Sequence, residues 1–255
     1  MPSSRILEIC VQSLEHAVAA ERAGADRLEL CADLSCGGVT PSESLMRAAR
    51  HAVRIPIHVL VRPRAGDFCY SENDLEQMRG AIRASKQLGI DGVVLGILQK
   101  NGRVDVERTT AFVELARPLP VTFHRAFDVS PDPEASMEDV IQTGASRILT
   151  SAGQIHATDG LALLARLVRA ATKRISIMPC GGINPGNVVQ IARETSASEI
   201  HSSAGTSNLN ATGSGKELSP AKAGSDSDSV LASFERQVAN MARLLRDMPH
   251  VKAAR

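Results

Sequence analysis

Two short segments near the start of the chain, residues 7–10 and 28–31, have nearly the same sequence, LEIC and LELC. Each is typical of a β-strand that carries a glutamate and, two residues later, a cysteine on the same face. Residues 13–25 between them have the pattern of a helix that ends at a glycine. A strand, a short helical connection and a second strand predict a parallel βαβ unit. We therefore expect the two thiols to lie at the same level on adjacent strands.

The same alternation continues along the chain. Strands are predicted at residues 6–10, 27–31, 57–61, 92–95, 121–123, 147–150, 175–178 and 199–201, and further helices at 42–53, 72–88, 106–116, 134–143, 160–172, 187–195 and 229–246. Eight strands and eight helices in 255 residues predict one (β/α)₈ TIM-barrel domain over the whole chain. A doubly wound open sheet is the alternative, but the glycine-rich fingerprint that it favours after the first strand is missing.

Residues 206–229 differ from the rest, because almost all of them are small and polar. Such a segment cannot bury much apolar surface, so we expect a low-complexity, disordered loop. In a barrel it would follow the eighth strand on the face where barrel enzymes carry their chemistry. A lid that becomes ordered when ligand binds is the other interpretation.

Composition excludes several classes of function. A net charge of +1, with no Trp and a single Tyr, lacks the basic excess and the stacking residues of nucleic-acid-binding proteins. No apolar run has the length of a membrane span, and no apolar signal segment precedes the first strand. Five cysteines without a C-x-x-C pair do not suggest a disulfide framework. We therefore expect a cytoplasmic protein with reduced thiols and no nucleic-acid or membrane partner.

Polar residues gather at the carboxyl ends of the predicted strands, where TIM barrels place their functional groups. The candidates for binding a small anionic ligand are Glu8, Arg62, Arg64, Arg125, Gly181, Gly182, His201 and Ser202. In this set Gly181, Gly182 and Ser202 suit a phosphate, which backbone N–H groups can bind. Glu29 and His124 are candidate acid–base groups. The alternative is structural, since Glu8 and Glu29 could pair with Arg62 or Arg125 inside the barrel.

Cys10 and Cys31 are candidate metal ligands, because two thiolates on adjacent strands can hold a soft ion such as Cu(I). Buried cysteine is also a common small apolar residue, and for these two residues taken alone packing is the favoured explanation. No lysine lies at a strand end and no H-E-x-x-H motif is present, which disfavours a Schiff-base aldolase and a hydrolytic zinc site.

Several of these segments together resemble the CutC family. The resemblance lies in LEIC, GADRLELC, GGVTPS, RPRAGDFCYS, VTFHRAFD, LTS and HSSAG, which occur in the family's order between about residues 7 and 205. It implies a TIM barrel, a cytosolic role in copper homeostasis and homo-oligomeric assembly. It also implies that Cys10 and Cys31 are the ligands of Cu(I).

Two hypotheses for function remain open at this point. The first is a Cu(I)-binding protein of copper homeostasis that uses Cys10 and Cys31. The second is a TIM-barrel enzyme of unknown reaction that acts on a small anionic or phosphorylated metabolite, with Arg62, Arg64 and Arg125 binding the anion. The charged residues at the ends of the predicted strands suit an organic anion better than a soft cation. The resemblance to the CutC family favours copper instead.

Overall fold

The computed structural model describes residues 5–205 and 225–249. Its strands are β1 (Ile6–Val11), β2 (Arg27–Leu30), β3 (Ile57–Leu60), β4 (Gly92–Leu95), β5 (Val121–Phe123), β6 (Arg147–Thr150), β7 (Ser176–Pro179) and β8 (Glu199–Ser202). Its α-helices are α1 (Leu14–Arg22), α2 (Glu43–Ala52), α3 (Glu72–Gln87), α4 (Val106–Ala116), α5 (Pro133–Gln142), α6 (Leu161–Ala171), α7 (Val188–Thr195) and α8 (Ser225–Arg246). Short 3₁₀ helices, η1 (Leu34–Cys36), η2 (Arg125–Val129) and η3 (Ala157–Gly160), follow β2, β5 and β6.

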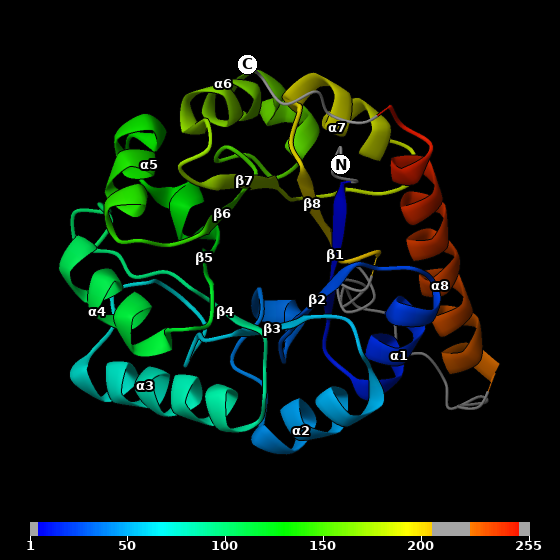
Figure 1. Ribbon diagram of the computed structural model, residues 1–255, viewed down its shortest axis with the longest axis horizontal. Helices are drawn as coiled ribbons and strands as arrows, with labels where there is room; N and C mark the ends of the chain where they lie inside the picture. The colour runs from blue at the N-terminus through cyan, green and yellow to red at the C-terminus, as the bar shows by residue number, and fades with distance from the viewer. Residues whose placement is uncertain (1–4, 206–224, 250–255) are drawn as a thin grey trace, which may run out of the picture.

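The strands form one parallel sheet in the order β7-β6-β5-β4-β3-β2-β1-β8. β7 and β8 lie next to each other without a ladder among the described residues, so the sheet is a nearly closed barrel. Figure 1 looks along this barrel and shows the helices in a ring around the strands. The predicted TIM barrel is confirmed. In the part of the chain that the structure describes, no helix has the length and apolar character needed to cross a membrane.

Local sequence explains where the helices begin and end. Serine side chains accept backbone N–H groups at the start of α1, α2 and α3, and Asp132 does so at α5. The predicted start of the last helix at residue 229 is wrong, because α8 begins at Ser225. Residues 225–229 of the predicted loop are therefore helical, and residues 206–224 lie outside the described residues.

Side chains alternate between two environments along each strand. The apolar residues Leu7, Ile9, Leu28 and Leu30 are fully buried in the core that the strands share with the helices. The residues between them, which include Glu8, Cys10 and Glu29, face the interior of the barrel and contact other strands. Strand alternation thus delivers both the packing and the polar interior.

A buried charged layer, formed by Glu8, Arg27, Arg147 and Glu199, fills the amino-terminal half of the barrel. Arg27 binds Glu8 on the neighbouring strand and Glu199 at 2.5 Å, and Arg147 binds Glu199 at 2.6 Å. Burial alone would raise the pKa of both glutamates, but the two arginines outweigh it and hold these pKa values below their usual range. The glutamates of the layer are therefore ionised, and their ion pairs with the arginines join β1, β2, β6 and β8.

Two histidines in the interior depend on glycines of β4 and of the loop after it. A Cβ on Gly92 would lie 2.5 Å from the His58 ring, and one on Gly96 would lie 2.5 Å from the His124 ring. Only glycine leaves room for these rings. Burial lowers the pKa of His58 to about 4 and that of His124 to about 3, so both imidazoles are neutral in the folded protein.

Arg27→Met should destabilise the fold by about 3–5 kcal/mol, because it removes the buried cation that Glu8 and Glu199 share and leaves Glu8 without an arginine partner. Urea unfolding followed by circular dichroism measures the loss. The control is Arg174→Gln, which removes an exposed ion pair with Glu138 and should cost far less. Equal losses in the two variants would contradict a structural role for the charged layer.

Acid should destabilise the protein partly through His58. In the unfolded chain His58 is protonated below pH 6.5, the ordinary pKa of histidine. In the folded protein it is protonated only below about pH 4. The free energy of unfolding should therefore fall as pH drops through this window, by up to about 1.4 kcal/mol per pH unit for this group. His58→Gln should reduce that slope in urea titrations between pH 4 and 7, and an unchanged slope would refute the assignment.

Candidate functional site

The thiols of Cys10 and Cys31 meet in the barrel interior, with their Sγ atoms 3.5 Å apart. Both side chains are buried, with 3% and 0% exposure. The expectation that the two cysteines lie at the same level is wrong, because the ladder pairs Cys10 with Glu29 and places Cys31 two residues further on. Neighbouring strands of a closed barrel are staggered, so the Cys10 and Cys31 thiols meet diagonally across β1 and β2.

Glu29 lies beside the Cys10 thiol, as the register requires. The Cys10 Sγ donates to Glu29 Oε1 at 3.4 Å, and the other carboxylate oxygen, Oε2, is buried without a partner among the described residues. Burial raises the pKa of Glu29. Contact with Cys31, together with burial, raises the pKa of the Cys10 thiol well above its usual range. Without a metal ion, this thiol is protonated at neutral pH.

His201 connects the thiols to the charged layer. Its Nδ1 donates to Glu8 Oε1 at 2.8 Å. Burial opposes the charge on His201, but the carboxylates of Glu29 and Glu8 outweigh it and raise the pKa of the imidazole. Ligand atoms of Cys10, Glu29 and His201 lie within 4.8 Å of one another. The sequence indicated these residues individually, but only the strand register brings them together.

The surroundings of the thiol pair suit a soft ion. Cys10 and Cys31 share an apolar cluster with Leu60 and Val94, and Leu34 packs against it. Two sulfur atoms in an apolar enclosure form a donor set that favours Cu(I) over harder ions. Glu29 and His201 add oxygen and nitrogen donors on one side. The remaining cysteines, Cys36, Cys69 and Cys180, lie elsewhere, and no other described group of three or more potential ligands meets the same spacing.

The three arginines predicted to bind an anion have different surroundings. Arg64 pairs with Asp67 at 2.9 Å, in the loop after β3, and with Asp74 at 3.2 Å, in the first turn of α3. Arg125 pairs with Asp128 at 2.8 Å. Arg62 is buried and donates to main-chain carbonyls instead. Neither Arg62 nor Arg125 pairs with Glu8 or Glu29, and the partner of Glu8 is Arg27, which sequence analysis did not single out.

The residues predicted to bind phosphate pack against neighbouring loops. A Cβ on Gly181 would lie 2.8 Å from the Ile155 carbonyl oxygen, and one on Gly182 would overlap the His156 ring. The Ser202 hydroxyl donates to the Ile183 carbonyl at 2.6 Å. These contacts explain the small residues by packing, and a phosphate-binding role stays a prediction.

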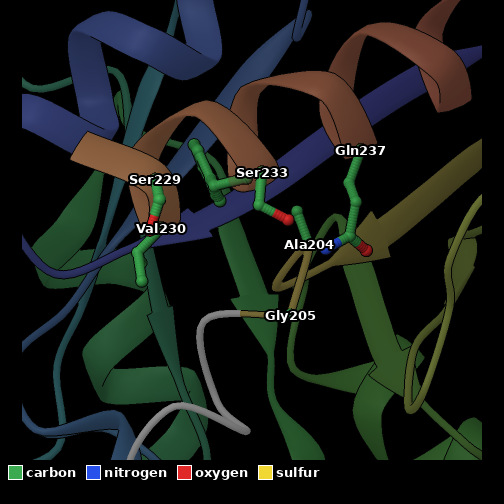
Figure 2. A pocket seen from close by; sticks show the side chains of 7 residues that line it. Ala204, Gly205, Ser229, Val230, Ser233 and Gln237 are labelled. Carbon is green, nitrogen blue, oxygen red and sulfur yellow. The ribbon is translucent and has the colours of Figure 1, made fainter. Parts of the chain in front are cut away.

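A shallow cavity of about 240 Å³ lies between the end of β8 and α8. Figure 2 shows Ser229, Ser233 and Gln237 of α8 facing Ala204 and Gly205 across it. It is lined by Ala204, Gly205, Ser229, Val230, Ser233, Phe234 and Gln237. None of the residues predicted to carry function lines this cavity, so it is separate from the thiol pair.

Comparison with solved structures supports the fold and includes a match to a protein of the CutC family. The crystal structure of the CutC protein from Streptococcus agalactiae matches with a TM-score of 0.75 and 32% identity, covering 78% of this chain and 98% of that one. Thiamine phosphate pyrophosphorylase from Pyrococcus furiosus matches with a TM-score of 0.59 at 14% identity, covering 95% and 96% of the two chains. At that identity the second likeness concerns the barrel alone.

Sequence comparison is more specific. The human copper homeostasis protein cutC homolog is 46% identical over 199 residues, which is 78% of this chain and 73% of that protein. A CutC family protein from Chromobacterium violaceum is 46% identical over 200 residues, 78% of this chain and 81% of its own. The CutC family model matches residues 5–206, the whole barrel up to the end of β8. The chain therefore belongs to the CutC family.

Proposed function

We propose that this protein binds Cu(I) through Cys10 and Cys31 and serves copper homeostasis in the cytoplasm. The observation that carries the proposal is the buried pair of Sγ atoms 3.5 Å apart. The names of the human and mouse relatives, copper homeostasis protein cutC homologs, point to the same role. The cytoplasmic location and a homo-oligomeric state rest on the composition and the family resemblance.

Loading of the site requires that protons leave the thiols, because the thiolate is the form that binds metal. Glu29 Oε1 accepts from the Cys10 Sγ and is the nearest described acceptor for its proton. A protonated Glu29 would offset the negative charge that a second thiolate adds. The carboxylates of Glu29 and Glu8 raise the pKa of His201 on the same side, which favours its protonated form. The residues around the thiols thus favour a bound cuprous dithiolate.

Charge balance explains why copper binding and the polar interior are compatible. In the charged layer, two arginines offset Glu8 and Glu199. The layer is therefore neutral overall, and the carboxylate that acts on the Cys10 thiol is that of Glu29. The alternative of a TIM-barrel enzyme acting on a small anionic metabolite stays a prediction.

The double variant Cys10→Ser/Cys31→Ser should lose Cu(I) binding. Anaerobic competition with a chromophoric chelator measures affinity and stoichiometry. We expect one tight site in the unaltered protein and a loss of more than about 100-fold in the variant, since even the loss of a residue that only orients a ligand costs 10–100-fold.

The matched control is Cys69→Ser, because the Cys69 thiol donates to the Gln99 carbonyl, away from the thiol pair. It should bind copper as the unaltered protein does. Circular dichroism must show that the double variant is folded, and Cys10→Ser alone, whose hydroxyl can still donate to Glu29, provides a milder test. Unchanged copper binding by both the double variant and Cys10→Ser would refute the proposal.

A further inference from the structure

Arg62 is a buried cation without a carboxylate. It is 6% exposed, and its Nη atoms donate to the carbonyl oxygens of Gly38 at 2.7 Å, Gly66 at 2.9 Å and Cys36 at 3.1 Å. Its Nε–H has no partner, and no ion pair reaches it from any described residue. A guanidinium stays ionised in proteins, so its burial normally requires an anion.

The other arginines of the barrel have carboxylate partners. Arg27 and Arg147 share Glu199, and the exposed Arg125 at the carboxyl end pairs with Asp128. Neutral carbonyl groups fix the position of the Arg62 guanidinium. None of the described residues supplies a counterion for this positive charge at the end of β3.

His124 offers a second unused donor. Its Nδ1 accepts the N–H of Ala126 at 3.1 Å, which fixes the neutral tautomer with the proton on Nε2. The ring is 5% exposed, and Nε2 has no partner among the described residues. A buried N–H without an acceptor is costly, so this donor is also available for a ligand.

The two donors lie at the same end of the barrel. The Arg62 Cζ is 5.1 Å from the centre of the Phe68 ring, and the centre of the His124 ring is 4.9 Å from it. Tyr70 lies near them as well, since the charge of Arg62 acts on both His124 and Tyr70. The Tyr70 hydroxyl is engaged by the Arg62 side chain, so it is not counted among the free donors. Two donors, on Arg62 and His124, therefore lie next to Phe68.

We propose that Arg62 and His124 form a binding site for a small monocarboxylate, with the Arg62 Nε–H and the His124 Nε2–H donating to its oxygens. One guanidinium balances one negative charge. A doubly charged phosphate would leave a charge uncompensated in a buried site. The low exposure of Arg62 and His124 limits the ligand to a few heavy atoms.

This site is beside the thiol pair but uses different atoms. Gly38, whose carbonyl holds Arg62, adjoins Cys31, since a Cβ on Gly38 would lie 3.5 Å from that of Cys31. The carboxylate site needs neither thiol, so it goes beyond copper binding and is tested without metal.

Calorimetric titration of the metal-free protein with formate and acetate, at constant ionic strength, tests the proposal. We expect saturable binding and a matching rise in the thermal unfolding temperature. His124→Asn should weaken binding roughly tenfold or more, because it removes a donor to a charged group. Its side-chain oxygen can still accept the Ala126 N–H. The control Arg174→Gln, which removes an exposed arginine, should bind as the unaltered protein does.

Acetamide, which lacks the charge, and chloride, which lacks the two oxygens, should have no saturable effect. Equal effects of acetamide or chloride would overturn the proposal, and so would undiminished binding by folded His124→Asn. If that variant does not fold, nitrogen-detected NMR of the unaltered protein decides. A shift of the His124 Nε2–H signal on adding formate supports the site, and an unmoved signal overturns it.

Discussion

The ion pairs of Arg27 with Glu8 and Glu199 are the interaction on which the interior depends. They cross the amino-terminal half of the barrel and hold β1, β2 and β8 together. Glu8 uses its second oxygen to accept His201 Nδ1 at 2.8 Å, so the same carboxylate that binds Arg27 also orients the imidazole above it. A chain with an apolar layer here could close a barrel, but it would lack the Glu8 carboxylate, which binds His201 and, with Glu29, raises its pKa.

That arrangement determines the chemistry of the thiols. Cys10 lies level with Glu29, in an apolar cluster, and burial raises the pKa of the Glu29 carboxyl. The pKa of the Cys10 thiol is raised as well, by its contact with Cys31 and by burial. Sulfur donors in an apolar cluster favour soft ions over hard ones, because oxygen-seeking ions gain too little from sulfur to offset burial.

Sequence predicted most of the fold and part of the site. Alternation of side chains and glycines after helices were sufficient for eight strands, and the helix starts predicted at residues 42 and 72 lie within one residue of the observed starts of α2 and α3. The pairing of Cys10 with Glu29 was missed, because the stagger between strands is a property of the closed barrel that no local pattern encodes. Arg27 was overlooked as the partner of Glu8 because it stands at the first residue of its strand, where a charge is usually solvated. Arg64 was selected for its position, but Asp67 of its own loop and Asp74 of α3 already pair with it.

Two kinds of donor thus occupy adjacent parts of one barrel end. Sulfur atoms on β1 and after β2 face an apolar cluster, whereas the N–H donors of Arg62 and His124 follow β3 and β5. Leu60 and Val94, on β3 and β4, belong to the sulfur side and keep it apolar. A soft cation and a small anion have opposite charges and need different donors, so neither competes for the atoms of the other. Gly38 adjoins both Cys31 and Arg62. A ligand bound at the thiols would therefore affect the backbone that positions Arg62, and a ligand bound at Arg62 would affect the backbone next to Cys31.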